Sequence, residues 1–120
     1  MTIFDRSLEL GRGSTGILLI HGLGGTPFEL RVVAIGLARH GFMVHCPQLA
    51  GHCGSYQELR ATGWRDWYRS VEAAHERLLR SCDRVIVGGL SMGAILALHL
   101  AAQRPSEVAG MALFAPTLKL

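Results

Sequence analysis

The sequence contains little charge and no cluster of it. Charged residues make up 18% of the 120 residues, and the formal net charge is only +3, with a sequence pI of about 9.1. The basic residues are scattered singly, as at Arg60, Arg65 and Arg69. The chain therefore lacks the basic patch typical of nucleic-acid binding. Hydrophobic residues make up 49%, which favours one core-rich globular domain and excludes a disordered chain.

Several other signals are absent. The three cysteines, Cys46, Cys53 and Cys82, form no Cys-x-x-Cys pair, which indicates reduced thiols in a cytoplasmic protein. The N-terminus has no basic segment followed by an apolar one, so we expect no signal peptide. No apolar run is long enough to be a transmembrane segment. No histidine pair has metal-ligand spacing with acidic partners, so we expect no metal site.

What the sequence does contain is an alternation of short apolar runs with longer helical patterns. It predicts strands at 17–20, 42–46, 84–88 and 110–114, with a long irregular connection over 48–63. Helices are predicted after Thr26, over 64–80 and over 91–104, each at the point where the apolar spacing changes to that of a helix. This order is typical of an α/β fold, a parallel sheet of about four strands with helices on both faces. The first helix should pack on one face and the other two on the opposite face.

Two apolar stripes indicate which helix faces are buried. In the helix after Thr26 the residues with helical spacing are Phe28, Val32, Ile35 and Ala38. In the helix over 64–80 they are Trp67, Val71, Ala74 and Leu78.

The segment Gly89-Leu90-Ser91-Met92-Gly93 fits the pattern Gly-x-Ser-x-Gly. It follows a predicted buried strand and opens a predicted helix, which is the setting of a nucleophile elbow. Gly89 and Gly93 would let strand and helix approach closely, and the helix dipole favours negative charge near the Ser91 hydroxyl. We predict Ser91 to be a nucleophile; the alternative is a serine that only caps the helix.

A glycine-rich loop, His21-Gly22-Leu23-Gly24-Gly25, leaves the first predicted strand at the same sheet edge. Ligands of open α/β sheets bind at that edge. We predict that the backbone N–H groups of Leu23 and Met92 form an oxyanion hole, with Gly22 shaping the loop. The alternative is a tight turn without a catalytic role. The spacing is not that of a dinucleotide-binding loop, and the chain lacks the Lys-Ser/Thr pair of a phosphate loop.

The histidines near these motifs are expected to be structural. His21 should orient the glycine-rich turn, and His52 should pack in its own loop. His99 lies eight residues after Ser91 on one predicted helix, which is about 12 Å along the axis. That distance is too large for it to accept the serine proton.

Together, the segments 17–25, 51–52, 64–71 and 85–93 resemble α/β-hydrolases, and more narrowly bacterial carboxylesterases and monoacylglycerol-lipase-like enzymes. The resemblance implies hydrolysis of small-molecule carboxylic esters through an acyl-serine, without a cofactor. It implies Ser91 as nucleophile and the amides of Leu23 and Met92 as oxyanion donors. A lysophospholipase or monoacylglycerol lipase is an alternative, and a non-catalytic binding or assembly protein is an alternative of another class. One local departure is Gly51-His52-Cys53, where these enzymes often have Gly-His-Gly.

In this fold the triad order is Ser, then Asp or Glu, then His. After Ser91 the chain has only Glu107 and, before it, His99. We therefore expect residues 1–120 to be the N-terminal part of a single domain, with the acid loop, histidine loop, lid and last strands beyond them. The isolated chain should have negligible esterase activity, and the exposed edge of its last strand should favour self-association.

Overall fold

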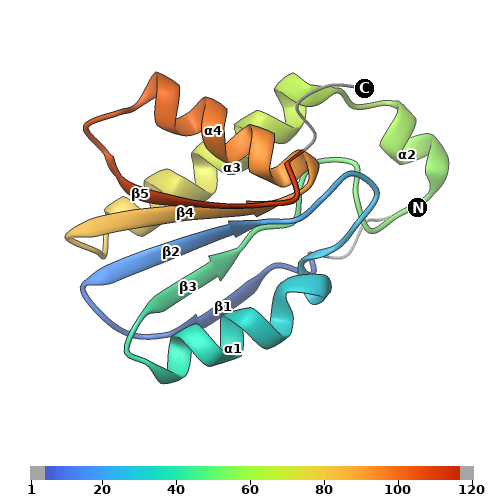
Figure 1. Ribbon diagram of the computed structural model, residues 1–120. Coiled ribbons are helices and arrows are strands. Elements are labelled where there is room, and N and C mark those ends of the chain that lie inside the picture. Colours follow the sequence, from blue (N-terminus) through green and yellow to red (C-terminus); the bar gives the residue numbers. More distant parts are fainter. Residues whose placement is uncertain (1–4, 117–120) are drawn as a thin grey trace.

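The structure, a computed structural model, describes residues 5–116. Its centre is one five-stranded sheet with helices on both faces (Figure 1). The strands are β1 (Leu8–Gly11), β2 (Thr15–Ile20), β3 (Met43–Cys46), β4 (Arg84–Leu90) and β5 (Val108–Phe114). Their spatial order is β1-β3-β2-β4-β5. The four strands from β2 to β5 are parallel to one another, as predicted.

The fifth strand, β1, was not among the predicted strands. It pairs with β3 in the antiparallel direction, with Leu8 opposite Cys46 and Gly11 opposite Met43. Leu8 and Leu10 pack against the core on the side of Val44 and Cys46. β1 therefore extends the predicted parallel sheet by one short antiparallel edge strand.

The helices lie on the two faces of the sheet as predicted. The helix α1 (Arg31–Arg39) contacts β1 and β3. The helices α3 (Trp64–Leu79) and α4 (Met92–Gln103) contact β2, β4 and β5 from the opposite face (Figure 1). Alternate residues of β2 show the two faces. Ile17 and Leu19 belong to the core cluster that contains Ala34, and Leu18 and Ile20 to the cluster that contains Val71. A 3₁₀ helix (Pro27–Leu30) comes directly before α1 and packs on the same face. A further short helix, α2 (Tyr56–Arg60), comes before α3 in the chain.

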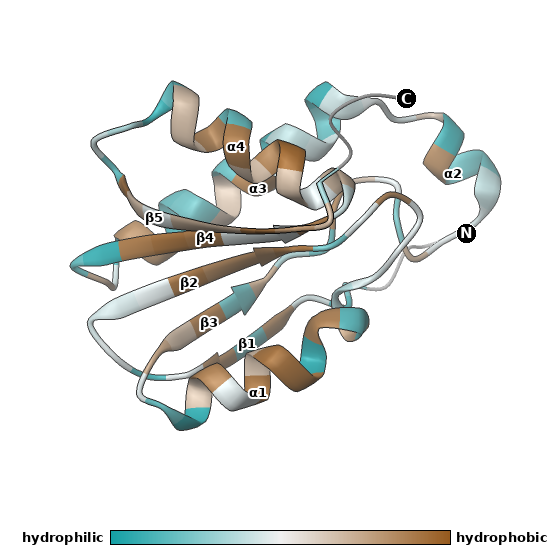
Figure 2. Cartoon of the chain, in the orientation of Figure 1, coloured by the Kyte–Doolittle hydropathy of each residue, from teal (hydrophilic) through white to brown (hydrophobic). Residues whose placement is uncertain are grey.

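Hydrophobic residues run continuously from Ile17 to the end of β2 and through much of β4 (Figure 2). In β2 the residues from Gly16 to Ile20 are all buried, so this strand is covered on both faces, as the unbroken apolar run predicts. Each fully buried Leu or Ile stabilises the fold by about 1.5–3 kcal/mol. The carboxyl ends of β2 and β4 therefore project from a rigid base.

One of the two predicted helix stripes is correct, and the other is wrong at its first two positions. In α3, Val71, Ala74 and Leu78 are buried, as predicted. On the other face, Phe28 is 64% exposed and Val32 is 78% exposed, while Leu30 and Ala34 are buried instead. The chain begins this element as a 3₁₀ helix with three residues per turn. The buried Leu30 and Ala34 each lie two residues after a predicted position, which is about 200° around an α-helix.

Candidate active site

The two motifs singled out in the sequence lie next to each other. β2 and β4 are neighbouring parallel strands, and Ile20 is paired with Gly89. The loop that follows β2 and the turn that follows β4 consequently leave the sheet at the same edge. This is the edge at which open α/β sheets bind ligands.

Ser91 lies in a sharp turn between the last residue of β4 and the first residue of α4. Its backbone has φ 57° and ψ −118°, a conformation that costs a non-glycine residue about 1–3 kcal/mol and occurs mainly at functional sites. The Ser91 N–H donates to the carbonyl oxygen of Phe114 on β5 at 2.8 Å. Among the described residues, its side chain makes no capping hydrogen bond to α4. The geometry therefore favours a nucleophile elbow over a helix cap.

Gly89 and Gly93 allow the close packing that this turn requires. A Cβ atom on Gly89 would overlap the backbone of Gly93, and a Cβ on Gly93 would overlap the carbonyl oxygen of Ile20. The same Cβ on Gly93 would lie 2.6 Å from the carbonyl oxygen of His21. The first turn of α4 thus packs directly on the backbone where the glycine-rich loop begins.

Gly22 brings the glycine-rich loop against Ser91. A Cβ atom on Gly22 would lie 3.5 Å from the Cβ of Ser91. The Gly22 N–H donates to Oε1 of Glu29 at 3.0 Å, and the Gly25 N–H closes a turn onto the Gly22 carbonyl at 3.0 Å. Glu29 was not among the residues predicted to support this loop. The backbone amides of Leu23 and Met92 lie in this loop and at the start of α4, and their role as oxyanion donors stays a prediction.

His21 and His52 are buried beside this loop, with 0% and 2% of their surfaces exposed. His21 Nδ1 is 2.8 Å from the Gly22 carbonyl oxygen, and its Nε2 accepts from the Leu49 N–H at 3.2 Å. Burial lowers the pKa of His21 below its ordinary value of 6.5, so the ring is neutral at pH 7. Both ring nitrogens of His21 are engaged with the backbone, which fits its predicted structural role.

Comparison with known proteins agrees with this geometry. The family described as the alpha/beta hydrolase fold matches residues 16–119. The chain belongs to the α/β-hydrolase family. The α/β-hydrolase fold accounts for the largely parallel sheet with helices on both faces.

Relatives of this α/β-hydrolase chain include ester-hydrolysing enzymes. It is 41% identical over 93 residues to the thermostable monoacylglycerol lipase of Bacillus sp. (strain H-257), and this match covers 78% of the chain and 37% of the lipase. It is 33% identical over 89 residues to a carboxylesterase of Bacillus subtilis (strain 168), covering 73% of the chain and 36% of the esterase. The chain thus spans little more than a third of the length of these relatives.

A solved structure shows how far the fold agrees. One from work on LipS and LipT, two metagenome-derived lipolytic enzymes, superimposes with a TM-score of 0.91 at 34% identity. The superposition covers 94% of this chain and 46% of that one. Nearly all of this α/β-hydrolase chain therefore has the fold of the corresponding part of a lipolytic enzyme structure.

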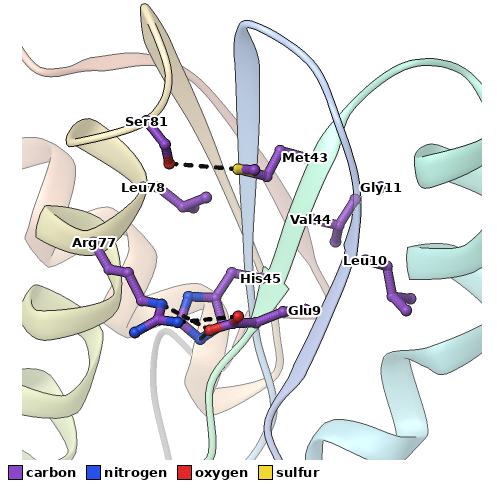
Figure 3. A pocket seen from close by; sticks show the side chains of 9 residues that line it. All are labelled: Glu9, Leu10, Gly11, Met43, Val44, His45, Arg77, Leu78 and Ser81. Carbon is purple, nitrogen blue, oxygen red and sulfur yellow. Dashed lines mark hydrogen bonds and ion pairs between the residues drawn. The ribbon is translucent and has the colours of Figure 1, made fainter.

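A second cluster of serine, histidine and carboxylate lies elsewhere in the α/β-hydrolase chain and has a different role. A cavity of about 320 Å³ is lined by side chains that include Glu9, His45, Arg77 and Ser81 (Figure 3). The Ser81 hydroxyl contacts the sulfur of Met43 at 3.5 Å, while Glu9 binds Arg77 with contacts of 2.7 and 3.1 Å. The ion pair between Glu9 and Arg77 joins β1 to α3, and His45 Nε2 lies 3.8 Å from the Glu9 carboxylate.

His99, on α4, packs against aromatic rings at the side of the molecule. Its ring centroid lies 4.6 Å from that of Tyr68 and 5.5 Å from that of Trp64.

The described part of the chain holds no group of three or more His, Cys, Asp or Glu placed to bind a metal ion. Among residues 5–116, no helix combines the length and apolar character needed to cross a membrane.

Proposed function

We propose that this chain carries the nucleophile of a serine hydrolase that cleaves carboxylic esters through an acyl-serine intermediate. The observation that carries the proposal is the backbone of Ser91, held at φ 57° between β4 and α4 with Gly22 against it. A strained serine at the carboxyl edge of a parallel sheet is what an exposed nucleophile requires. The names of the two Bacillus relatives support an ester as substrate.

In the proposed reaction the Ser91 Oγ attacks the ester carbonyl carbon while its proton passes to a base. The carbonyl oxygen becomes an oxyanion, which the N–H groups of Leu23 and Met92 would stabilise. Collapse of this intermediate breaks the C–O bond, and the alcohol leaves with the proton. Water then hydrolyses the acyl-serine in the reverse order of steps and releases the carboxylic acid.

We further propose that the base and acid of the triad come from a part of the protein outside these 120 residues. His21 and His52 are the histidines beside the loop, and all four of their ring nitrogens are hydrogen-bonded to the backbone. His99 is packed against Tyr68 and Trp64. His99 also lies eight residues after Ser91, which is about 12 Å along a helix axis. Residues 1–120 are accordingly the N-terminal part of a single catalytic domain.

The test compares the wild-type chain with Ser91→Ala. The wild-type chain should hydrolyse a chromogenic short-chain ester no faster than the variant, since loss of the triad base costs orders of magnitude in rate. A fluorophosphonate probe should nevertheless modify Ser91 in preference to Ser81, because the oxyanion hole favours attack at the elbow. Peptide mass spectrometry reads out both sites. Equal modification of the two serines would contradict the proposed nucleophile, and Ser91-dependent turnover at an ordinary enzymatic rate would contradict the missing triad.

A monoacylglycerol lipase or lysophospholipase activity is the second candidate, because the higher identity of the two Bacillus relatives is to the monoacylglycerol lipase. The lid that would set the acyl-chain preference is proposed to lie outside residues 1–120. If the fluorophosphonate probe does not modify Ser91, the alternative hypothesis of a non-catalytic binding or assembly protein is favoured. A cytoplasmic location, based on the three thiols, also stays a proposal.

Self-association through β5 is a further expectation. Among the described residues β5 pairs only with β4, and its side chains Met111 and Phe114 are 46% and 49% exposed. An unpaired strand edge with apolar side chains favours association. Sedimentation equilibrium should show concentration-dependent oligomers that the double variant Met111→Lys, Phe114→Lys reduces. The control Val32→Lys, at an exposed position on α1, should leave them unchanged; a monomeric wild-type chain would contradict the expectation.

A further inference from the structure

We propose that His21 and His52 are positioning residues that together hold the oxyanion loop (residues 21–25) in place. They would do so as two neutral imidazoles, each with its proton on Nδ1. The inference deepens the proposed function and rests on it, because it concerns the loop that contains the Leu23 amide. We call these two residues the imidazole pair.

The hydrogen bonds of the pair are reciprocal. His21 belongs to the oxyanion loop, and its Nε2 accepts the Leu49 N–H of the neighbouring loop at 3.2 Å. His52 belongs to that neighbouring loop, and its Nε2 accepts the Gly24 N–H of the oxyanion loop at 3.0 Å. Each loop thus gives one ring and one amide to the other. The two rings also touch edge to face, with centroids 4.9 Å apart.

The contacts of the remaining nitrogens decide the tautomer. Nδ1 of His21 lies 2.8 Å from the Gly22 carbonyl oxygen, and Nδ1 of His52 lies 2.9 Å from the Ala50 carbonyl oxygen. A carbonyl oxygen only accepts, so each Nδ1 must carry the proton. An Nε2 that accepts a backbone N–H must be unprotonated. Only the neutral Nδ1–H form satisfies all four bonds, and a doubly protonated ring would place an N–H against an N–H.

The pair is itself fixed by α3. The His52 ring packs edge to face on Trp67, with centroids 5.7 Å apart. The Trp67 indole N–H donates to Oγ1 of Thr62 at 2.9 Å, and the Ala50 N–H donates to Oγ of Ser70 at 3.0 Å. The neighbouring loop is thereby anchored to a helix whose apolar face is buried in the core.

Leu23 depends on this arrangement because it has no anchor of its own in its side chain, which is 59% exposed. The residues on both sides of it are held instead. Gly22 is bound by Glu29 and by the His21 ring, and Gly24, at φ 72°, is bound by the His52 ring. Fixing both neighbours fixes the direction of the Leu23 amide. Preorganised donors of this kind are what stabilises an oxyanion.

The first experiment reads the tautomers and the loop directly. In 15N-labelled chain at pH 8, imidazole nitrogen spectra should show His21 and His52 as Nδ1–H tautomers, assigned by their loss in His21→Gln and His52→Gln. Hydrogen exchange of the Gly24 amide should become at least ~10-fold faster in His52→Ala, while that of Ile20 in β2 stays the same. His52→Gln, which keeps an acceptor, should restore part of the protection.

His40→Gln is the matched control, because the His40 ring also faces a carbonyl, that of Gly36 at 2.8 Å, but is exposed at the end of α1. It should leave Gly24 exchange unchanged. An Nε2–H tautomer at His52, or unchanged Gly24 exchange in His52→Ala, would overturn the proposal.

The second experiment separates this inference from the proposed function. Fluorophosphonate modification of Ser91 should be at least ~10-fold slower in His52→Ala than in wild type and should partly recover in His52→Gln. Equal rates in wild type and His52→Ala would overturn the positioning role while leaving Ser91 as the nucleophile. A wild-type chain that is not modified at Ser91 overturns the proposed function and the catalytic part of this inference together. The exchange and tautomer measurements then still decide whether the pair holds the loop.

Discussion

The variant Gly93→Ala is expected to lose about 3 kcal/mol of unfolding free energy, or to fail to fold. Gly93 lies in the first turn of α4, and an added Cβ would overlap the carbonyl oxygen of Ile20 and approach that of His21. The first oxygen belongs to the last residue of β2 and the second to the first residue of the loop that follows, and both residues are fully buried. The methyl group would therefore separate α4 from the sheet at the point where Ser91 is held.

The matched control is Gly36→Ala, because Gly36 also lies in a helix, α1. A Cβ atom there would meet nothing within 4 Å, so the variant should gain about 0.5–1 kcal/mol from the lower conformational entropy of alanine in the unfolded chain. Urea unfolding followed by fluorescence of Trp64 and Trp67 gives both free energies. If the two substitutions change stability by the same amount and sign, close packing at the elbow is not the reason for glycine at position 93.

The sharp strand–turn–helix at Ser91 could be predicted because its causes are local in the sequence. A buried strand, two small residues at fixed spacing and an apolar helix follow one another between residues 84 and 104. The pairing of Ile20 with Gly89, which brings the loop to the elbow, follows from the parallel order of the strands. For these two features sequence and structure agree, because the turn is determined by adjacent residues and the pairing by the order of the strands.

The features that sequence reasoning missed depend on contacts between distant segments or on small backbone changes. β1 is only four residues long, and its backbone is paired with β3, which is distant in the sequence. Phe28 and Val32 have the apolar spacing of a helix and are nevertheless exposed, so this spacing alone does not reveal the buried face. α2 did carry a local signal, the capping box between Ser55 and Glu58. Glu29 as a partner of the Gly22 amide had none, because its role arises only when the loop folds over the helix start.

Cys53 is the one departure from the common Gly-His-Gly pattern, and the structure shows its physical consequence. The residue has φ 66°, in the left-handed region that favours glycine. The neighbouring His52 ring is hydrogen-bonded through both nitrogens, to the Gly24 N–H and the Ala50 carbonyl oxygen. Cys53 thus adopts a strained backbone conformation directly beside a ring that is held on both sides.

The stability of the fold should decrease as the pH falls below about 6.5, and His75 should be a principal cause. Its ring lies in α3 with 0% of its surface exposed, and within the described residues neither ring nitrogen has a hydrogen-bond partner. Burial lowers the pKa of His75 from the ordinary value of 6.5, as it does for His21 and His45. Below pH 6.5 the unfolded chain thus binds more protons than the folded one. Each such histidine removes up to about 1.4 kcal/mol per pH unit until the folded pKa is reached.

His75→Leu should raise the unfolding free energy by about 1 kcal/mol at pH 8, because it replaces two unpartnered buried nitrogens with an apolar side chain. Between pH 6.5 and 5, the unfolding free energy of this variant should also fall less steeply than that of the wild type, by up to about 1.4 kcal/mol per pH unit, which corresponds to one proton. Tyr68→Phe is the matched control on the same helix: it removes a buried hydroxyl without a partner among the described residues, and burial raises its pKa further above 10. This control should keep the wild-type pH dependence. Urea unfolding at half-unit pH steps measures the slopes, and an unchanged slope in His75→Leu would show that His75 does not carry the acid sensitivity.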